Sequence, residues 1–461
     1  MIEKDPTEKE LPEKLYDPTH NPDGLLVMGV AENALMTPVF TEYTEKHSHL
    51  HPDHLRYRWT TRKGFAPTAE EALPNYINDT FHPIIPVTQE NSVAGAGVGS
   101  LISQFCWHVC EDGDAFLITA PFYDGFRGDC AYPSGTGLVV VDIPPSIDPL
   151  TKESVKYLEA AIKEPKTGGP TIRGLILCNP HNPLGTIYPT ESIVAYAQLA
   201  EKYDLHLLVD EIYGNQVYAS SLVPHPPPFV SALSLDLLSL ANCNPSRVHV
   251  VAGPSKDFGA SGLCIGIFIS QHNPELVKLM DSAAESNQIS GSTNAIFAAA
   301  LSDRQWRDWF LEENRRRTAE AFEVVVAWCR FHKIPLLPCY AGQFAIMDLE
   351  SVLNHFRTKK TLEEKEEALS SKMLKAGVLM FPTGQDQYPT RYRLVFVRPR
   401  DVLQLGLRRL ETAFGLPHMS EIGAKGDSDQ ETAERSGCVI TQKLVDAVSL
   451  GTSTGTCRKP C

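Results

Sequence analysis

Between about residue 90 and residue 275, short apolar runs alternate with segments of helical periodicity, and this alternation constrains the fold more than any other feature. The apolar runs predict strands at Ala115–Thr119, Leu138–Ile143, Gly174–Cys178, His206–Val209, Val248–Ala252 and Cys264–Ser270. The intervening helices are expected at about 97–110, 151–163, 190–203 and 274–287. Near-continuous apolar strands separated by helices are typical of a mostly parallel sheet that is covered on both faces. The sequence therefore predicts an α/β fold.

The flanking segments predict the domain organisation. Residues 1–24 are polar and Pro-rich and are expected to form an N-terminal arm that orders only against something else. A large domain is expected at 25–305, with 25–85 contributing in part to a smaller domain, and a C-terminal small domain at 306–417 that begins with a long amphipathic helix. Residues 418–461 are rich in Gly, Ser, Thr and Asp with little periodicity, which predicts a mostly disordered tail.

Composition excludes several classes of function. Of the 461 residues, 43% are hydrophobic, which is enough for a large core, and the net charge of −14 argues against a nucleic-acid-binding surface. No apolar run approaches the roughly 18 residues of a membrane span, and the charged N-terminus lacks the apolar centre of a signal peptide. The eleven cysteines form no CxxC pair, so neither a metal site nor a disulfide framework is expected. The composition favours a cytoplasmic enzyme.

Two residues carry the first chemical prediction. Lys256 lies among turn-forming residues in the segment Gly253–Gly262, and a lysine that must lose its proton to attack an aldehyde needs a tight, partly desolvated loop. Asp210 ends the apolar run Leu205–Val209, where a carboxylate can pair with a protonated pyridine nitrogen. Together they predict pyridoxal 5'-phosphate (PLP). A lone lysine in a Ser/Gly loop is ordinarily a solvated surface residue, so the prediction depends on further segments.

Three more segments support the prediction that the chain binds PLP. Asn179–Gly185 contains two Asn-Pro steps directly after a predicted strand, which fix a loop at the carboxyl edge of the sheet, where the Asn182 amide can donate to a phenolate oxygen. Pro121–Phe126 also follows a strand, and Tyr123 can stack on a cofactor ring or pack in the core. Asn91–Gly99 is a small-residue turn before a helix, which is either an anion site or a simple chain reversal.

At this point the sequence resembles a known family. The motifs Asn179–Gly185, Asp210–Tyr213 and Ser255–Gly259 resemble those of fold-type I PLP enzymes, aminotransferase classes I and II. Further segments are similar to the 1-aminocyclopropane-1-carboxylate (ACC) synthase-like branch, namely Tyr16–Gly24, Met28–Asn33 and Tyr340–Asp348. The resemblance spans about 15–415. It implies the aspartate aminotransferase-like PLP-dependent transferase fold, with a mostly parallel seven-stranded sheet in the large domain and a smaller α+β domain.

The resemblance also implies roles for individual residues. Lys256 binds the cofactor covalently and shuttles the Cα proton, and Asp210 pairs with the pyridinium. The other implied cofactor contacts are Asn182 and Tyr213 to the phenolate, Tyr123 to the ring face, and the amides of Ala96, Gly97 and Val98 to the phosphate, with Ser255 nearby. Two further residues are implied to bind substrate: Arg393 binds the α-carboxylate, and Glu32 lies over the substrate.

The chain departs from the family pattern in three places. Cys264 stands where the family has an arginine that pairs with the cofactor phosphate, and Gly253 stands where it has a serine. The tyrosine that reaches the neighbouring subunit's phosphate aligns with either Tyr57 or Trp59. A buried phosphate without a charged partner binds less tightly, by about 2–4 kcal/mol. The cations that could compensate are Arg56, Arg58, Arg62 and Lys63.

The site residues named above do not distinguish between the possible reactions. Transamination and β- or γ-elimination both use Lys256, Asp210 and Arg393, so an aminotransferase of specialised metabolism and a lyase of ACC synthase-like or carbon–sulfur type both remain open. The missing arginine leaves a third hypothesis, a catalytically degenerate paralogue. A homodimer is expected because active sites of this fold type usually lie between subunits, and Gln288–Asn294 is a candidate cross-subunit segment.

Overall fold

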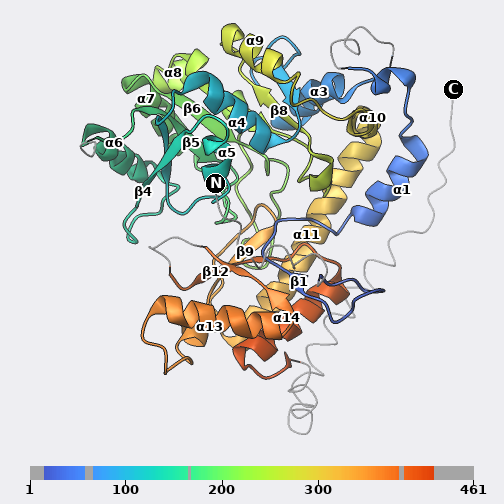
Figure 1. Ribbon diagram of the computed structural model, residues 1–461, viewed down its shortest axis with the longest axis vertical. Coiled ribbons are helices and arrows are strands. Elements are labelled where there is room, and N and C mark those ends of the chain that lie inside the picture. The colour runs from blue at the N-terminus through green and yellow to red at the C-terminus, as the bar shows by residue number, and fades with distance from the viewer. Residues whose placement is uncertain (1–14, 58–65, 165–167, 384–388, 420–461) are drawn as a thin grey trace, which may run out of the picture.

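A seven-stranded sheet forms the centre of the computed structural model, which describes residues 15–57, 66–164, 168–383 and 389–419 (Figure 1). The predicted tail beyond Met419, the start of the N-terminal arm and Trp59 lie outside the described residues. No helix in the described ranges has the length and apolar character needed to cross a membrane.

The order of the strands confirms the predicted sheet. In space they run β2-β8-β7-β6-β5-β3-β4; the strands from β7 to β4 are parallel to one another, β8 is antiparallel to β7, and β2 is antiparallel to β8. The bounds are β2 Ser92–Gly95, β3 Ala115–Thr119, β4 Gly137–Val141, β5 Ile172–Cys178, β6 His206–Asp210, β7 Val248–Ala252 and β8 Gly266–Ile269. Each apolar run predicted as a strand forms one, and the sheet has the expected mostly parallel topology.

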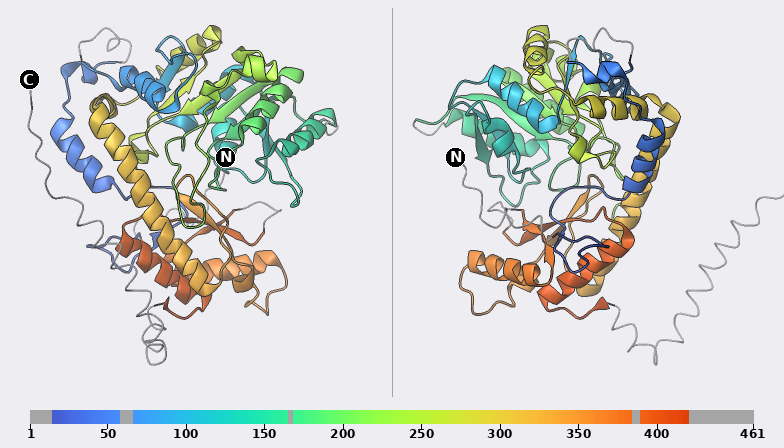
Figure 2. Two further views of the ribbon diagram at one scale, coloured as in Figure 1. Left: turned by 180° about the vertical axis from the view of Figure 1, so that it is seen from behind. Right: turned by 45° about the vertical axis from the view of Figure 1, so that its right-hand side comes forward.

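Helices cover both faces of this sheet, as Figures 1 and 2 show. Side chains of successive residues on β6 alternate between two apolar cores, with Leu207 and Val209 in one core and Leu208 in the other. The second of these cores is completed by α4 (Val98–Val109), α5 (Phe126–Ala131) and α9 (Pro274–Ala283). The first is completed by α1 (Thr37–His47), α3 (Ala69–Phe81), α6 (Val155–Lys163), α7 (Thr190–Lys202), α8 (Leu237–Ala241) and α10 (Gly291–Ser302).

The helix α11 (Arg304–His332) connects this sheet to a second group of elements (Figure 1). Its early residues Phe310 and Leu311 pack in the large core, and its later residues, from Ala321 to Cys329, pack in a separate one. The elements around that separate core are β1 (Leu26–Val27), β9 (Phe344–Asp348), α12 (Glu350–Leu353), α13 (Leu362–Lys375), β10 (Val378–Leu379), β12 (Arg391–Val395) and α14 (Arg400–Phe414). The short strand β11 (Phe381–Pro382) pairs with β12. The domain limits at 305/306 and 417 remain predictions, since α11 belongs to both cores.

One local expectation differs from the structure. The segment Asn91–Gly99 is not a turn throughout, because Ser92–Gly95 forms the edge strand β2 before the chain enters α4. The described part of the N-terminal arm packs on its own chain: Arg409 of α14 donates to the carbonyls of Gly24 (2.6 Å) and Pro22 (2.8 Å) and lies over the Tyr16 ring. The guanidinium carries five donors, so it can bind two carbonyls of this polar segment at once.

Candidate active site

A cavity of about 510 Å³ lies where several parallel strands end. Asp210 is the last residue of β6, and Asn182, Tyr123 and Lys256 follow the ends of β5, β3 and β7. Because the carboxyl ends of parallel strands meet at one edge of a sheet, residues far apart in the sequence line the same space. All four side chains line the cavity, together with Tyr213, Ser255 and Arg393. The predicted site residues from the sheet therefore converge on one place.

The Lys256 amine lies inside this cavity rather than on the surface. Its Nζ donates to the carbonyl oxygen of Ala31 at 2.9 Å and to Ser261 Oγ at 3.2 Å. Burial lowers the pKa of Lys256, an effect that the negative charge of Glu32 partly opposes. A lowered pKa increases the share of neutral amine, which is the nucleophilic and basic form.

Asp210 is buried, and its carboxylate accepts a hydrogen bond from the Ile212 amide at 3.0 Å. Burial raises its pKa to about 7, while the Ile212 hydrogen bond and the positive charge of Lys256 act in the opposite direction. A carboxylate in this state lacks a cationic partner close enough to offset its desolvation. The site is therefore suited to receive a positively charged group next to Asp210.

A second set of residues, which sequence reasoning did not assign, holds the Lys256 backbone. Gln343 donates from Nε2 to the Lys256 carbonyl at 2.9 Å, and Asn314 donates to the Asp257 carbonyl at 3.0 Å. The Asp257 carboxylate accepts from Gln216 Nε2 at 3.0 Å and from the Tyr76 hydroxyl. Asp257 and Gln343 belong to the quoted motifs Ser255–Gly259 and Tyr340–Asp348, which were the available signals. Asn314 gave no signal, because its contact depends on packing.

Arg393 reaches the cavity from β12, which belongs to the three-stranded sheet β11-β12-β9 and not to the seven-stranded sheet. Its Nη1 donates to Asn182 Oδ1 at 2.9 Å, its Nη2 donates to the Gly29 carbonyl at 2.7 Å, and its guanidinium lies 5.5 Å from the Phe344 ring centre. Since an arginine can only donate, the Asn182 amide oxygen faces Arg393 and the amide NH₂ group is left to donate elsewhere. This orientation agrees with the donor role expected for Asn182.

The two aromatic residues of the prediction have different surroundings. Tyr213 is buried and packs edge-to-face on Phe344 at 5.4 Å, and burial raises the pKa of its hydroxyl far above the usual range. Tyr123 is 39% exposed and packs edge-to-face on Phe126 at 5.4 Å. Tyr213 therefore presents a firmly protonated phenol as a donor, whereas Tyr123 offers an accessible ring face.

The small-residue segment before α4 forms one end of the cavity. The Ala96 amide donates to the Asn287 carbonyl at 3.2 Å and the Gly97 amide to the Gly95 carbonyl at 2.8 Å. Gly97 has a φ of 93°, and α4 begins at Val98. The first amides of a helix have no intrahelical acceptor, so the anion-binding donors here begin at Val98. The Ser255 hydroxyl nearby contacts Ile265, donating to its carbonyl at 2.9 Å and accepting from its amide at 3.2 Å.

Two other residues, Asp129 and Cys264, make this end of the cavity less favourable for an anion. The Asp129 carboxylate lies against the first turn of α4, where a Cβ built on Gly99 would be 2.8 Å from Asp129 Oδ1. Burial raises the pKa of Asp129 to about 6. Cys264 lines the same end, exposed and in the left-handed conformation with a φ of 46°. The helix terminus that should attract an anion thus has a carboxylate beside it and a neutral thiol where an arginine is expected.

The remaining predicted residues lie at the edge of the site or outside it. Glu32 is close enough to Lys256 and Arg398 for its charge to raise the pKa of both, against the dominant effect of burial. Tyr57 is 72% exposed and lines a separate hollow with Arg56 and Gln288, so this chain does not bring it into its own cavity. Trp59, Arg58, Arg62 and Lys63 lie outside the described residues.

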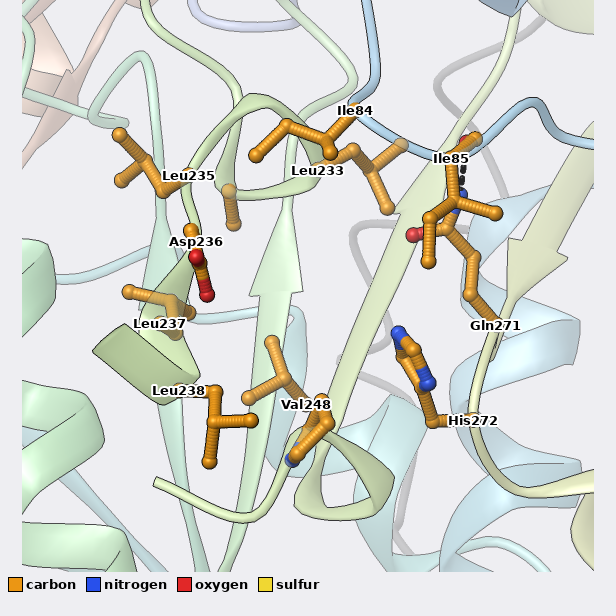
Figure 3. Close-up of a pocket in the computed structure, with 12 residues that line it drawn as sticks. Ile84, Ile85, Leu233, Leu235, Asp236, Leu237, Leu238, Val248, Gln271 and His272 are labelled. Atoms are coloured by element: carbon orange, nitrogen blue, oxygen red, sulfur yellow. Dashed lines mark hydrogen bonds between the residues drawn. The ribbon is translucent and has the colours of Figure 1, made fainter. Parts of the chain in front are cut away.

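The donor set fits PLP. The cavity combines a lysine amine, a buried carboxylate without a close cation, a phenol, an amide and an exposed aromatic ring, with helix amides at one end. These groups match the aldehyde, ring nitrogen, phenolate, ring face and phosphate of that cofactor. A different hollow of about 290 Å³, shown in Figure 3, is lined mainly by Ile84, Ile85, Leu233, Leu235, Leu237 and Leu238 and shares no residue with the site.

Comparison with known sequences gives consistent results. Residues 27–410 match the family model described as "Aminotransferase class I and II". The chain is 30% identical to "Probable aminotransferase aclI" of Aspergillus oryzae, over 84% of this chain and 90% of that protein. It is also 30% identical to 1-aminocyclopropane-1-carboxylate synthase-like protein 1 of Bos taurus, over 90% of this chain and 81% of that protein. A human relative named "Probable inactive 1-aminocyclopropane-1-carboxylate synthase-like protein 2" is 28% identical over 86% and 68%.

Solved structures show the same fold. An aspartate aminotransferase double mutant of Thermus thermophilus superposes with a TM-score of 0.62 at 19% identity, covering 84% of this chain and 91% of that one. The PLP-bound C–S lyase of Staphylococcus hominis superposes with a TM-score of 0.63 at 17% identity, covering 85% and 91%. The expected aspartate aminotransferase-like fold is confirmed.

The raised pKa of Asp210 predicts a pH-dependent stability effect. The unfolded carboxyl titrates near 3.8 and the folded one near 7, so the folded state binds the proton more tightly and Asp210 destabilises the cofactor-free protein increasingly as pH rises through this window. Asp210→Asn should therefore raise the free energy of unfolding at pH 8 by up to about 4 kcal/mol more than at pH 4. Urea unfolding at the two pH values measures the difference.

The exposed Asp124, whose side chain is 81% accessible, provides the matched control. Asp124→Asn should change unfolding by a similar small amount at both pH values. An equal effect of Asp210→Asn at pH 4 and pH 8 would show that the buried carboxylate carries no desolvation cost.

Proposed function

We propose that this chain, which belongs to the aminotransferase class I and II family, is a PLP-dependent enzyme that acts at the Cα of an amino acid, with Lys256 as its catalytic residue. The observation that carries the proposal is the convergence of Lys256, Asp210 and Arg393 on one cavity from two different sheets. An amine, a carboxylate and a guanidinium so placed match the aldehyde and ring nitrogen of the cofactor and the carboxylate of the substrate.

The cofactor would be held by groups that already point into the cavity. When bound, PLP supplies an aldehyde that captures the substrate amine and a cationic ring that withdraws electrons from Cα. Asp210 would keep the proton on the ring nitrogen, and a cation at that position offsets the cost of burying the carboxylate. Tyr213 and the Asn182 amide would donate to the phenolate, and the first-turn amides of α4 would bind the phosphate.

Lys256 would carry out the proton transfer at Cα. Its lowered pKa favours the neutral amine, which can accept a proton. The amine reaches the cavity from the end of β7, where the hydrogen bonds of Gln343 and Asn314 fix the backbone on which it sits. The contacts of Nζ with the Ala31 carbonyl and Ser261 would be exchanged for contacts with cofactor and substrate.

Arg393 would orient the substrate. Its guanidinium is half-buried, and its contacts with Asn182 and Gly29 keep the planar fork at the cavity wall. A fixed fork suits a carboxylate, which it binds through two parallel hydrogen bonds. Glu32 contributes a negative charge next to Lys256, where a positively charged substrate group could be recognised.

Transamination is the favoured reaction, and elimination is the second candidate. Transfer of the amino group requires only the residues described above, and relatives named as aminotransferases match most of the chain. The likeness to ACC synthase-like relatives and the match of Met28–Asn33 to that branch keep a lyase as the alternative. A degenerate paralogue is the alternative of another class, supported by Cys264 at the arginine position and by the human relative named as inactive.

The proposal predicts that Lys256 binds the cofactor covalently. Borohydride reduction of the protein with PLP should attach the cofactor to the peptide that contains Lys256, as measured by peptide mass spectrometry. Lys256→Ala should abolish this attachment and lower turnover of an amino-acid panel by about 10³-fold, since a positioned base contributes about 10²- to 10⁴-fold. Lys202→Ala, a change at a largely exposed lysine on α7, is the control.

The products of the same panel separate the hypotheses. Keto acid formed with transfer of nitrogen to a second keto acid supports transamination, and free ammonia supports elimination. Absence of labelling at Lys256 even with excess PLP would support the degenerate paralogue and end the proposal.

A second prediction concerns the phosphate end of the cavity. Cys264→Arg should tighten PLP binding about fivefold, because it places a cation near the start of α4, where Asp129 adds a negative charge. Cys264→Gln is the matched control, with a long side chain and the same left-handed backbone but no charge. Equilibrium dialysis of PLP measures the affinities; equal affinities for the two variants would show that charge at position 264 is not what the site lacks.

We also propose a homodimer, supported by two neighbouring surface segments. The segment 52–57 packs on the start of α10, where a Cβ on Gly291 would collide with the His54 carbonyl. Leu55 there is 77% exposed and Tyr57 is 72% exposed. Exposed apolar residues beside a candidate cross-subunit segment are typical of an interface between copies of a chain.

The dimer prediction is tested at Leu55. Sedimentation velocity should give about twice the mass of one chain, and Leu55→Lys should shift the protein toward monomer and reduce activity, because it places a charge in an apolar contact. Leu240→Lys, at a 51% exposed leucine of α8, is the control. A fully active monomer would contradict the proposal.

A further inference from the structure

Phe381 is an aromatic residue of the cavity wall that the proposed mechanism does not use. It lies on β11, is 42% exposed and lines the same cavity as Lys256. In the antiparallel pairing of β11 with β12, Phe381 is directly opposite Arg393. Residues directly opposite each other in such a pair project to the same face of the sheet. The aromatic ring therefore lies next to the group that is proposed to bind the substrate carboxylate.

Gly29 connects these two residues. A Cβ built on Gly29 would lie 2.2 Å from Phe381 Cδ2 and 2.6 Å from Cε2, so the ring packs directly against the glycine backbone. The Gly29 carbonyl in turn accepts from Arg393 Nη2 at 2.7 Å. Any larger residue at position 29 would displace the ring, the guanidinium or both. Phe381, Gly29 and Arg393 thus form one unit of the wall.

The charges of the cavity limit which substrate side chains it can hold. Among the described residues that line it, the basic side chains are Lys256 and Arg393, and both already have a proposed role. The acidic ones are Asp129 and Asp210, and neither can pair with a substrate carboxylate. The apolar side chains of the wall include Val30, Ala31, Ile102, Ile212 and Phe381. A side-chain carboxylate would find no free cation among these described residues, whereas an apolar side chain would find an apolar surface.

We propose that Phe381 is a specificity-determining residue that selects amino acids with an aromatic or large aliphatic side chain over acidic ones. This inference rests on the proposed function, because it places the substrate α-carboxylate at Arg393. With the carboxylate there, the side chain can pack on the ring that Gly29 holds in place. Ring-on-ring or ring-on-aliphatic contacts add to the burial of the substrate, and an unpaired carboxylate is disfavoured.

The test uses unreactive carboxylates, so that it does not depend on turnover. Isothermal titration calorimetry of the PLP-treated protein with 3-phenylpropanoate and with succinate compares an aromatic with an acidic distal group on the same carboxylate frame. We expect 3-phenylpropanoate to bind at least about tenfold more tightly, in the range that apolar pockets discriminate. Phe381→Ser should weaken its binding about fivefold to tenfold and change that of succinate less than twofold.

Three further variants make the result specific. Gly29→Ala should weaken 3-phenylpropanoate binding as well, because the added methyl group displaces the Phe381 ring. Trp309→Ser removes a 48% exposed aromatic residue from α11, outside the cavity lining, and should leave both affinities unchanged. Phe381→Leu, which keeps an apolar side chain, should retain most of the preference.

The outcomes separate this inference from the proposed function. If Lys256 is labelled by PLP but succinate binds as tightly as 3-phenylpropanoate, or if Phe381→Ser has no effect on either ligand, the inference is wrong and the proposed function stands. If Lys256 is not labelled, the proposed function fails, while a preference for 3-phenylpropanoate that depends on Phe381 would still support an apolar carboxylate site.

Discussion

The burial of the Asp210 carboxylate at the end of β6 is the constraint on which the rest of the site depends. Its pKa of about 7 reflects a charge removed from water without a sufficient partner, and Lys256 in the same cavity has a pKa lowered by the same burial. Neither group would be kept in this state for stability alone, because a protein gains little from two poorly paired buried charges. A cationic ring nitrogen beside Asp210 and an aldehyde that reacts with Lys256 would remove the cost of burying both groups, and this is why the cavity suits PLP.

At the phosphate end of the cavity, groups that attract an anion and groups that repel it lie side by side. A helix terminus with free amides attracts an anion, but Asp129 lies against its first turn and Cys264 replaces the expected arginine. Burial raises the pKa of Asp129 to about 6, so near that pH part of the population is neutral and the repulsion of a phosphate is reduced. The site would therefore hold PLP more through covalent and ring contacts than through charge at the phosphate. The proposed enzyme and the degenerate paralogue differ in whether these contacts suffice to bind the cofactor.

Most of the fold could be predicted from local sequence patterns. Strands β3 and β7 have the bounds that their apolar runs predict, because buried parallel strands leave strong patterns. The edge strand β2 was missed, since its run of small residues reads equally well as a turn. The N-terminal arm was expected to order only against something else, and its described part packs on α14 through Arg409, a contact between residues more than 380 positions apart.

The sequence by itself determined the family, the cofactor and the residues at the ends of the strands, because parallel topology brings those ends to one edge whatever the loops do. Only the tertiary structure decided what surrounds them. Phe381 packs on Gly29, Arg393 reaches the Gly29 carbonyl across 364 positions, and Gln343 holds the Lys256 backbone. Burial and contact of this kind arise when separate elements pack around a common cavity, and a linear pattern of residues does not contain the distances on which pKa values and specificity depend.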